Sequence, residues 1–385
     1  MRPIFNDLFN QEVIIREFEN YLENSKTKNE AWLIIDESNF DSNFIAKKFA
    51  RALLCEKLGC GNCEICESNN ELNHPDFDEL EGYGNSIRVE QVRELVSKAY
   101  LAPSISSRRI VLVNNSEKLN ETSSNALLKS LEESNKNTTW ILSTNSISQI
   151  SMTLRSRCRQ VEVKPLTPAN IAQFLKLKYN IDSQKTQLIS RICFGSLKYA
   201  SQYVEISNLL STRTTLMNKF LEIENLPAVF EYAKILIDTS KELSLVTNSE
   251  NYLEEAKVAW GLKGTKMAAG GNKYIKEIEK QAKDRQLENQ KIILSTFLIS
   301  LALLVRDVIM VKTKTFENKS ITEPDLIQKA MDKFQCSSEI ELIKILDLIL
   351  DISTNLNKNV SENLMLESLF SQIRHLSSVG RASLS

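Results

Sequence analysis

Short apolar runs alternate with helical segments through about the first 164 residues. The runs are Ala31–Ile35, Arg109–Val113 and Thr139–Leu142, and between them lie helical patterns that end near Cys55 and over residues 126–133. The runs are apolar almost throughout, as in strands that helices cover on both faces. This alternation predicts a parallel sheet flanked by helices.

The pattern changes after the last predicted strand, at 161–163. Pro165 and Pro168 follow that strand, and two or three short helices fit before residue 206, with Gly195 as a stop between them. Beyond that point the periodicity is helical only. The sequence therefore predicts an α/β domain, a small helical lid and an all-helical domain, at residues 1–165, 166–206 and 207–385.

Two segments of the helical region have unusual compositions. Thr247–Asp284 is rich in Lys and Glu and contains four glycines, which predicts an exposed loop or hairpin between helices. Ile292–Val305 carries no charged residue, but it is shorter than the roughly 20 residues that span a bilayer. We expect a buried core helix there. The first residues contain no apolar stretch of the kind found in secretory signals.

The overall charge is nearly balanced, with 48 Lys and Arg against 49 Asp and Glu in 385 residues. A chain of this length can form two or three domains, each with its own core. No strongly basic field is available to hold nucleic acid non-specifically. Any contact with DNA must be local or shared with partners.

The turn after the first predicted strand lies where a nucleotide-binding protein carries its glycine-rich phosphate loop. Aligned with the pattern G-x-x-x-x-G-K-[ST], Asp36 and Asp41 occupy the glycine positions, Ser42 the lysine position and Asn43 the Ser/Thr position. Together with Glu37, the two aspartates bring negative charge to a place where a triphosphate needs positive charge. The segment predicts a degenerate phosphate loop.

A second nucleotide-site feature is missing after the next apolar run. Arg109–Val113 is followed by Asn114 and Asn115, which leaves no carboxylate to organise magnesium. Both losses predict that the chain does not bind ATP tightly and has no intrinsic catalysis. The other interpretation is an ordinary α/β unit that never held a nucleotide, because fold alone does not fix function.

Four of the seven cysteines fall close together with the spacing C-x4-C-x2-C-x2-C: Cys55, Cys60, Cys63 and Cys66. Four thiolates complete a tetrahedral zinc site with no open position, so we predict a structural zinc knuckle in a reducing, cytoplasmic compartment. Gly59 and Gly61 permit the tight turns that such a knuckle needs. The alternative is four reduced cysteines in a mobile loop.

The remaining candidates for metal binding are weaker. His74 lies eight residues after the last clustered cysteine, but His74-Pro75-Asp76 is typical of entry into an extended segment, so we leave it out of the ligand set. Cys158, Cys193 and Cys336 are scattered, and we expect them to be small core residues.

Several short motifs occur in a characteristic order along the first 165 residues. They are Phe5–Glu12, Ala31-Trp32-Leu33, Leu54-Cys55 with the knuckle, His74-Pro75-Asp76, the helix at 125–133, and Leu154-Arg155-Ser156-Arg157-Cys158. Together they resemble the delta-prime subunits of the bacterial DNA polymerase III clamp loader. The resemblance is weaker, but compatible, through the helical remainder.

This resemblance implies an AAA+ domain, a helical lid and a collar domain that joins a ring of five subunits with motor and delta subunits. It implies a stator that helps ATP-driven loading of a sliding clamp on primed DNA, as part of the polymerase III holoenzyme and without a membrane. Ser156, Arg157 and Cys158 match the motif whose arginine acts on ATP bound by the adjacent motor subunit. The short first cysteine spacing and the segment around Gly261–Lys283 depart from the commonest pattern.

The arginine assignment has alternatives. In a helix Arg155 and Arg159 share one face while Arg157 points elsewhere, whereas an extended segment places all three together. Without the resemblance, a structural ion pair or solvated arginines would be the simpler interpretation. Lys198 occupies the position of a basic sensor in related ATPases, but without a nucleotide in the same chain we expect a surface lysine.

Two other function classes remain open. A self-sufficient AAA+ ATPase, such as a motor-type clamp-loader subunit, predicts nucleotide affinity for the isolated chain. A zinc-dependent nucleic-acid-binding protein needs basic and aromatic residues around its knuckle. The residues there give a net negative charge instead: Glu56, Lys57, Glu64 and Glu67.

Overall fold

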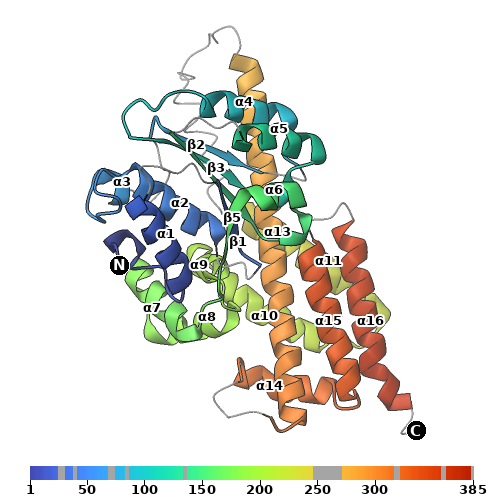
Figure 1. Cartoon of the computed structure of the whole chain (residues 1–385). Coiled ribbons are helices and arrows are strands. Elements are labelled where there is room, and N and C mark those ends of the chain that lie inside the picture. Colours follow the sequence, from blue (N-terminus) through green and yellow to red (C-terminus); the bar gives the residue numbers. More distant parts are fainter. Residues whose placement is uncertain are drawn as a thin grey trace, which may run out of the picture. The chain divides into compact units, whose positions relative to one another are not determined.

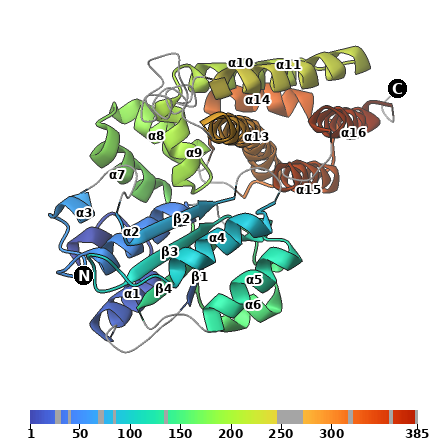
Figure 2. The same ribbon diagram turned by 90° about the horizontal axis from the view of Figure 1, so that it is seen from above.

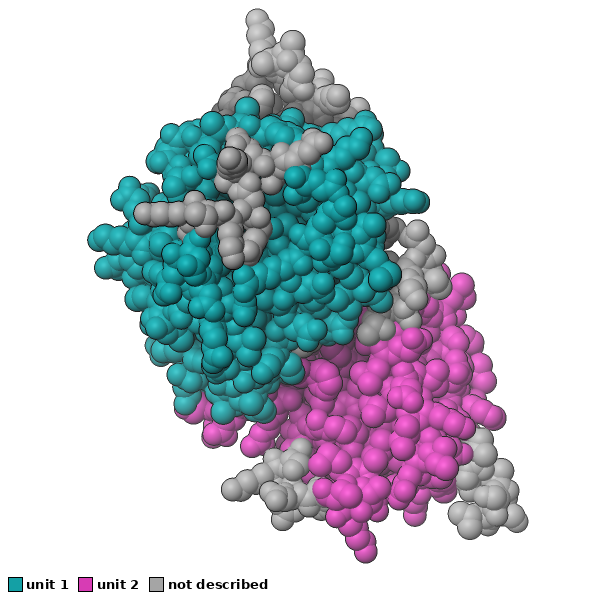
Figure 3. Space-filling model, viewed as in Figure 1, with its two compact units in different colours: residues 1–182, 195–198 teal, residues 183–194, 199–385 magenta. Residues whose placement is uncertain are grey.

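The computed structural model describes residues 1–24, 31–37, 41–67, 74–82, 86–132, 137–245, 271–315, 321–356 and 361–382. The chain forms two compact units (Figure 3). Unit 1 comprises residues 1–182 and 195–198, and unit 2 comprises residues 183–194 and 199–385. The predicted lid at 166–206 is thus divided between the two units.

A five-stranded sheet forms the centre of unit 1 (Figures 1 and 2). Its strand order is β2-β3-β4-β1-β5, and every pair of neighbours is parallel. The strands are β1 (Ala31–Ile35), β2 (Phe77–Glu81), β3 (Arg109–Asn114), β4 (Thr138–Thr144) and β5 (Cys158–Glu162). The predicted parallel sheet is confirmed, with the three apolar runs as its central strands.

The pattern of apolar residues indicates strand β2 much more weakly. This strand lies at one edge of the sheet and reads Phe-Asp-Glu-Leu-Glu, with every residue half-buried or exposed. An edge strand pairs on one side only and tolerates charged side chains. It therefore lacks the continuous apolar run that reveals a doubly covered strand.

Helices cover both faces of the sheet (Figure 2). The helices of unit 1 are α1 (Glu12–Asn24), α2 (Ser42–Leu54), α3 (Glu64–Glu67), α4 (Val89–Ala99), α5 (Glu121–Glu132), α6 (Met152–Arg157) and α7 (Pro168–Tyr179). Leu33 and Val111 pack with residues of α4, α5 and α6 on one face. On the other face Trp32 meets Phe18 of α1 and Phe49 of α2, whose rings stack 3.9 Å apart.

Asp76 fixes the connection between α4 and β3. It is fully buried, and its carboxylate accepts N–H groups from Ser104, Ile105 and Ser106 and the hydroxyl of Ser106. Arg109 Nη2 lies 3.7 Å from Asp76 Oδ1. Burial raises the pKa of Asp76, but the donated hydrogen bonds outweigh it and hold the pKa well below its ordinary value.

Part of the lid belongs to unit 1. Phe174 of α7 meets Phe44 of α2 edge-on, with ring centroids 6.3 Å apart. Gly195 takes φ +79° and its carbonyl accepts the Leu166 N–H at 3.1 Å. A Cβ at Gly195 would lie 3.1 Å from the carbonyl oxygen of Leu166, so this close approach favours glycine. Gly195 separates two helices, as predicted.

Unit 2 contains only helices among its described residues. They are α8 (Ser183–Ile192), α9 (Leu197–Glu205, whose first two residues belong to unit 1), α10 (Leu209–Leu221), α11 (Leu226–Leu245), α13 (Gly271–Lys312), α14 (Pro324–Lys333), α15 (Glu339–Asn355) and α16 (Glu362–Ala382). The long α13 packs against α11, α14 and α15 (Figure 1). The predicted all-helical C-terminal region is confirmed.

Two predictions about the region of α13 have different outcomes. The loop predicted over 247–284 is wrong for residues 271–284, which are helical; residues 246–270 lie outside the described part of the chain. Past Gly271 the sequence has no further glycine or proline in this stretch, and its Lys, Glu and Gln residues favour helix.

The core helix predicted at 292–305 is confirmed. The stretch Ala282–Lys312 is long and apolar enough to cross a membrane by composition, but its most apolar window is 83% buried inside the protein. Leu294, Leu298 and Val305 are fully buried. The apolar character of α13 is thus explained by packing within unit 2.

Candidate functional site

Asp36 lies directly after β1 and in front of α2. Its side chain is fully buried, and Oδ2 accepts the backbone N–H groups of Asp41 and Ser42, each at 2.9 Å. Its own N–H donates to Thr144 of β4 at 2.8 Å. Ser42 and Asn43 are the first two residues of α2. A carboxylate therefore occupies the helix N-terminus, where a phosphate loop would hold its anion.

Asp41 completes this turn in an unusual backbone conformation. Its φ of 138° lies in the region that favours glycine, and its Oδ1 caps α2 by accepting the Phe44 N–H at 3.0 Å. Burial raises the pKa of Asp41, and the Lys198 ammonium opposes that rise. Lys198 is half-buried. It is thus less exposed than the surface lysine that we expected.

The end of β3 forms another internally paired cluster. Asn114 is buried; its Nδ2 donates to Glu79 Oε1 at 2.7 Å, and its Oδ1 accepts the Ser143 hydroxyl at 2.9 Å. Lys47 of α2 bridges to Glu79 at 2.9 Å. The Glu79 carboxylate is therefore paired with the Lys47 ammonium and accepts a hydrogen bond from the Asn114 amide. These polar side chains bond to one another, so the cluster stabilises the fold at the end of β3.

Arg157 is the last residue of α6 and its side chain is 40% exposed. The guanidinium pairs with Glu132 at the end of α5, and Nη1 donates to the Thr153 carbonyl at 3.1 Å. Glu132 is also about half exposed, so solvent screens the pair, and such exposed pairs contribute roughly 0–1 kcal/mol. Ser156 is exposed beside it and donates to the same carbonyl at 2.9 Å.

The neighbouring arginines have different partners from Arg157. The helix ends at Arg157 and β5 begins at Cys158, so the three arginines occupy a helix end and a strand rather than one element. Arg155 Nε donates to the Ile150 carbonyl at 2.8 Å. Arg159 pairs with Glu17 and lies 4.9 Å from the centre of the Trp32 ring. Arg155 and Arg159 thus both make contacts within unit 1.

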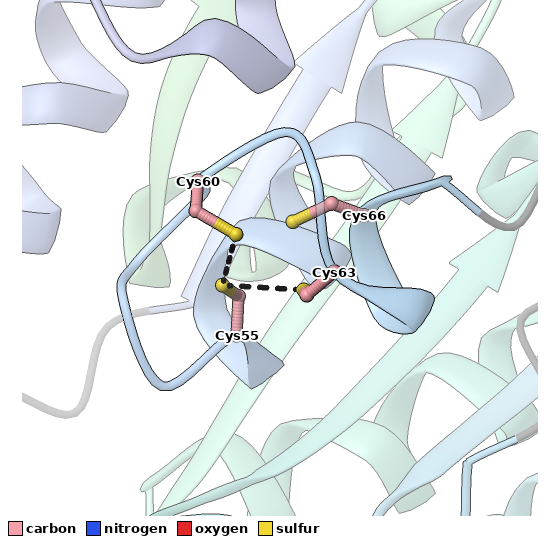
Figure 4. Close-up of side chains that lie close together, drawn as sticks. All are labelled: Cys55, Cys60, Cys63 and Cys66. Carbon is pink, nitrogen blue, oxygen red and sulfur yellow. Dashed lines mark hydrogen bonds between the residues drawn. The ribbon is translucent and has the colours of Figure 1, made fainter.

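The four clustered cysteines come together at the end of α2 (Figure 4). Their sulfur atoms all lie within 4.8 Å of one another, and Cys55 Sγ is 3.7 Å from the sulfurs of Cys60 and Cys63. Tetrahedral zinc with Zn–S bonds of about 2.3 Å requires sulfur atoms about 3.8 Å apart. The donor set and its spacing fit a structural zinc ion.

The backbone around these sulfurs is built for tight turns. Gly59 and Gly61 have φ values of +96° and +79°, and a Cβ on either would come 2.7 Å from Ile4 or Pro3. Burial raises the pKa of the Cys55 thiol, but backbone N–H groups outweigh it and lower the pKa to about 6. Burial raises the pKa of the Cys63 and Cys66 thiols, so the backbone donors favour the thiolate, the form that binds metal, at Cys55 only.

The other candidates lie outside the cluster. His74 accepts the Asp76 N–H at 3.1 Å just before β2, and it is not among the grouped ligand atoms. Cys158 and Cys193 are buried as predicted, and burial raises the pKa of Cys158 to about 12. Cys336 is only half-buried, so it is not the core residue that we expected.

Comparison with known proteins shows which proteins the chain is similar to. Residues 10–167 match the family described as DNA polymerase III, delta subunit. The gamma subunit of Buchnera aphidicola subsp. Schizaphis graminum is 29% identical over 257 residues, which cover 63% of this chain and 70% of the relative. The delta' subunit of Pseudomonas aeruginosa is 34% identical over 136 residues, covering 34% of this chain and 42% of the relative.

The chain is thus similar to subunits of the DNA polymerase III clamp loader, of both the gamma and the delta' kind. Among solved structures, a gamma subunit-related protein of Thermotoga maritima is 17% identical with a TM-score of 0.43, and the match covers 94% of this chain and 99% of that one. The parallel sheet flanked by helices agrees with the α/β class of fold predicted from the sequence.

Several interacting residues of this chain were not found by the sequence analysis. Glu132 pairs with Arg157, Glu79 with Lys47, and Lys198 acts on Asp41. The members of each pair are 25 or more positions apart, so only the folded chain joins them. Of these residues, only Glu132 lies in a motif named in the sequence analysis, the helix at 125–133.

Proposed function

We propose that the chain is a delta-prime-like stator of the DNA polymerase III clamp loader. One observation carries the proposal: Arg157 is exposed at the end of α6, while carboxylates occupy the N-terminus of α2 in the same unit. Such a subunit assists ATP hydrolysis in a neighbour without hydrolysing ATP itself. Its Arg157 can reach a partner, whereas carboxylates occupy the place where its own ATP phosphates would bind. ATP is then bound and turned over by partner subunits.

Arg157 acts on the γ-phosphate of ATP bound by a neighbouring motor subunit. A guanidinium is permanently charged and forks onto two phosphate oxygens, so it stabilises the charge that develops during phosphoryl transfer. Arginines supplied in trans accelerate GTP hydrolysis by roughly 10³- to 10⁵-fold. The exposed pair with Glu132 is weak, so its exchange for a phosphate costs little.

The proposed partners are those of the delta-prime subunits that the chain resembles. The chain joins motor and delta subunits in a five-membered ring in the cytoplasm, and the complex places a sliding clamp on primed DNA. With 48 basic and 49 acidic residues, the chain has little net charge to attract DNA by itself. Its contact with DNA is therefore local or passes through its partners. Co-purification with the other subunits as one stable complex tests this assignment.

A motor-type subunit is the second candidate, because the match to the Buchnera gamma subunit covers 63% of this chain. It predicts that the isolated chain binds ATP, and the buried carboxylates at α2 oppose that binding. Equilibrium titration with fluorescently labelled ATP separates the two. We expect no binding at micromolar concentrations, and saturable micromolar binding would favour the motor.

Cys55, Cys60, Cys63 and Cys66 hold a structural zinc ion in this proposal. With four sulfur ligands the ion has no open position, so it supplies stability and takes no part in hydrolysis. Elemental analysis of natively purified protein should find about one zinc per chain. Cys60→Ser should lose the metal, whereas Cys336→Ser, outside the cluster, should keep it. Metal-free native protein would reject the site.

A further inference from the structure

A buried arginine lies one helical turn before the four-cysteine cluster. Arg51 belongs to the last turn of α2 and is only 6% exposed, and its carbonyl accepts the Cys55 N–H at 3.0 Å. Residues four positions apart lie on the same face of a helix. A permanently charged guanidinium is therefore held inside the protein on the face that leads to the candidate zinc site.

Two negative groups act on this guanidinium. Burial lowers the pKa of Arg51, and the charges of Cys66 and Asp7 oppose that effect. The Asp7 carboxylate is also paired with the Lys48 ammonium, which lies 2.8 Å from its Oδ2. Cys66, once it is a thiolate, is thus a negative group that the Arg51 charge can balance within the protein.

Negative charge accumulates at the cluster when it holds zinc. The charges of four thiolates exceed the charge of one Zn²⁺ by two. Cys55 and Cys66 are 3% and 7% exposed, so water screens their charge only weakly. Between positions 56 and 67, three glutamates outnumber one lysine, so the surface of the turn adds to the imbalance. A buried cation nearby lowers the cost of holding the four thiolates together.

We propose that Arg51 is a positioning residue for the zinc site, with its guanidinium balancing the charge of the Cys66 thiolate from inside the protein. Arg51 does not bind the metal and acts through the sulfur that does. This inference rests on the proposed zinc site and deepens it, because it names a residue outside the four ligands on which zinc affinity depends.

The packing of the Arg51 side chain is a second effect that the experiment must separate from its charge. The side chain is buried, so its removal also disturbs the contacts of its methylene groups. Arg51→Met keeps an unbranched side chain without the charge, and Arg51→Lys keeps both. The difference between these two variants isolates the charge.

Zinc affinity is measured by competition with a chromogenic chelator, using the reduced full chain. Partners outside the ligand set commonly change metal affinity by 10- to 100-fold, so we expect Arg51→Met to bind zinc about 10- to 100-fold more weakly than wild type. Arg51→Lys should stay close to wild type. Lys57→Met is the matched control, because it removes a positive charge from an exposed side chain of the same turn and should bind zinc like wild type.

Substitution of Co²⁺ for zinc gives a readout that packing alone would not change. Cobalt held by four thiolates has absorption bands in which an electron moves from sulfur to metal, and a cation near a sulfur stabilises the electrons that move. Loss of that cation should shift these bands to longer wavelength. We expect this shift in Arg51→Met, and we expect Lys57→Met to keep the wild-type spectrum.

The outcomes separate this inference from the zinc site itself. Folded Arg51→Met that holds zinc as tightly as wild type would overturn the role of Arg51 and leave the zinc site intact. Equal losses in Arg51→Met and Arg51→Lys, with unshifted cobalt bands, would assign the effect to packing and overturn it as well. Wild-type protein without affinity for zinc would overturn both. If Arg51→Met does not fold, Arg51→Gln replaces it with the same expected results, because its amide is uncharged and still donates hydrogen bonds.

Discussion

Unit 1 contains two kinds of charged site: buried carboxylates that bond to the backbone, and an exposed arginine in a surface ion pair. Asp36 and Asp76 are fully buried, and each accepts two or more backbone N–H groups. Arg157 is 40% exposed and pairs with a carboxylate that is equally open to solvent. A charge whose hydrogen bonds are completed inside the chain stabilises the fold, and one held loosely at the surface is free for a partner. The comparison predicts large effects on stability at the first kind of site and large effects on activity at the second.

Asp76→Ala should have the largest effect on stability. The change leaves three N–H groups without their acceptor and Arg109 without its carboxylate, so we expect a loss of about 3–5 kcal/mol in the free energy of unfolding. Urea unfolding of both proteins at neutral pH gives the difference. A loss below about 1 kcal/mol would mean that buried carboxylates do not hold this unit together.

The same variant has a predictable pH dependence. The pKa of Asp76 in the folded protein lies below its ordinary value of 3.8, so its contribution is present above that value and disappears as the pH falls through the folded pKa. The difference between wild type and Asp76→Ala should therefore be constant near neutrality. It should shrink only below about pH 4.

Asp36→Ala should have a smaller effect, because two N–H groups lose their acceptor rather than three. We expect a loss of about 1–3 kcal/mol in unfolding free energy. Hydrogen exchange should also accelerate at the amides of Asp41 and Ser42, which supplies a local readout. Wild-type stability together with unchanged exchange would contradict the buried position of this carboxylate.

Arg157→Ala should change stability least, by about 0.5 kcal/mol or less, since its ion pair is exposed. Arg159→Ala is the matched comparison, because that side chain pairs with Glu17 and lies over Trp32. We expect it to cost about 1 kcal/mol. Thermal unfolding of both variants should place them in this order, and equal costs would remove the distinction between the two arginines.

The central strands could be predicted because they are covered on both faces and are therefore continuously apolar. Edge strand β2 gave a weak signal, and the glycines before residue 271 wrongly suggested a loop up to residue 284. The cysteine cluster was visible because its four members lie within twelve positions, so spacing alone brings them together.

The degenerate phosphate loop could be predicted from the sequence. The hydrogen bonds that the Asp36 carboxylate makes at the start of α2 could not. Composition shows that Asp36 and Asp41 are unsuited to phosphate, whereas only the turn shows that the Asp36 carboxylate bonds to the first N–H groups of α2. Lys198 lies 157 positions after Asp41, and no local pattern connects them. Pairings of this kind depend on the packing of the lid segment at 195–198 within unit 1.

ATP turnover by the reconstituted complex tests the central claim most directly. The motor subunits should be assembled with this chain as wild type, Arg157→Ala or Arg159→Ala, and hydrolysis measured with clamp and primed DNA present. We predict that Arg157→Ala assembles normally and that the rate at the site it serves falls by about 10³-fold, while Arg159→Ala keeps the wild-type rate. A fully assembled complex whose turnover is unchanged by Arg157→Ala would contradict the account.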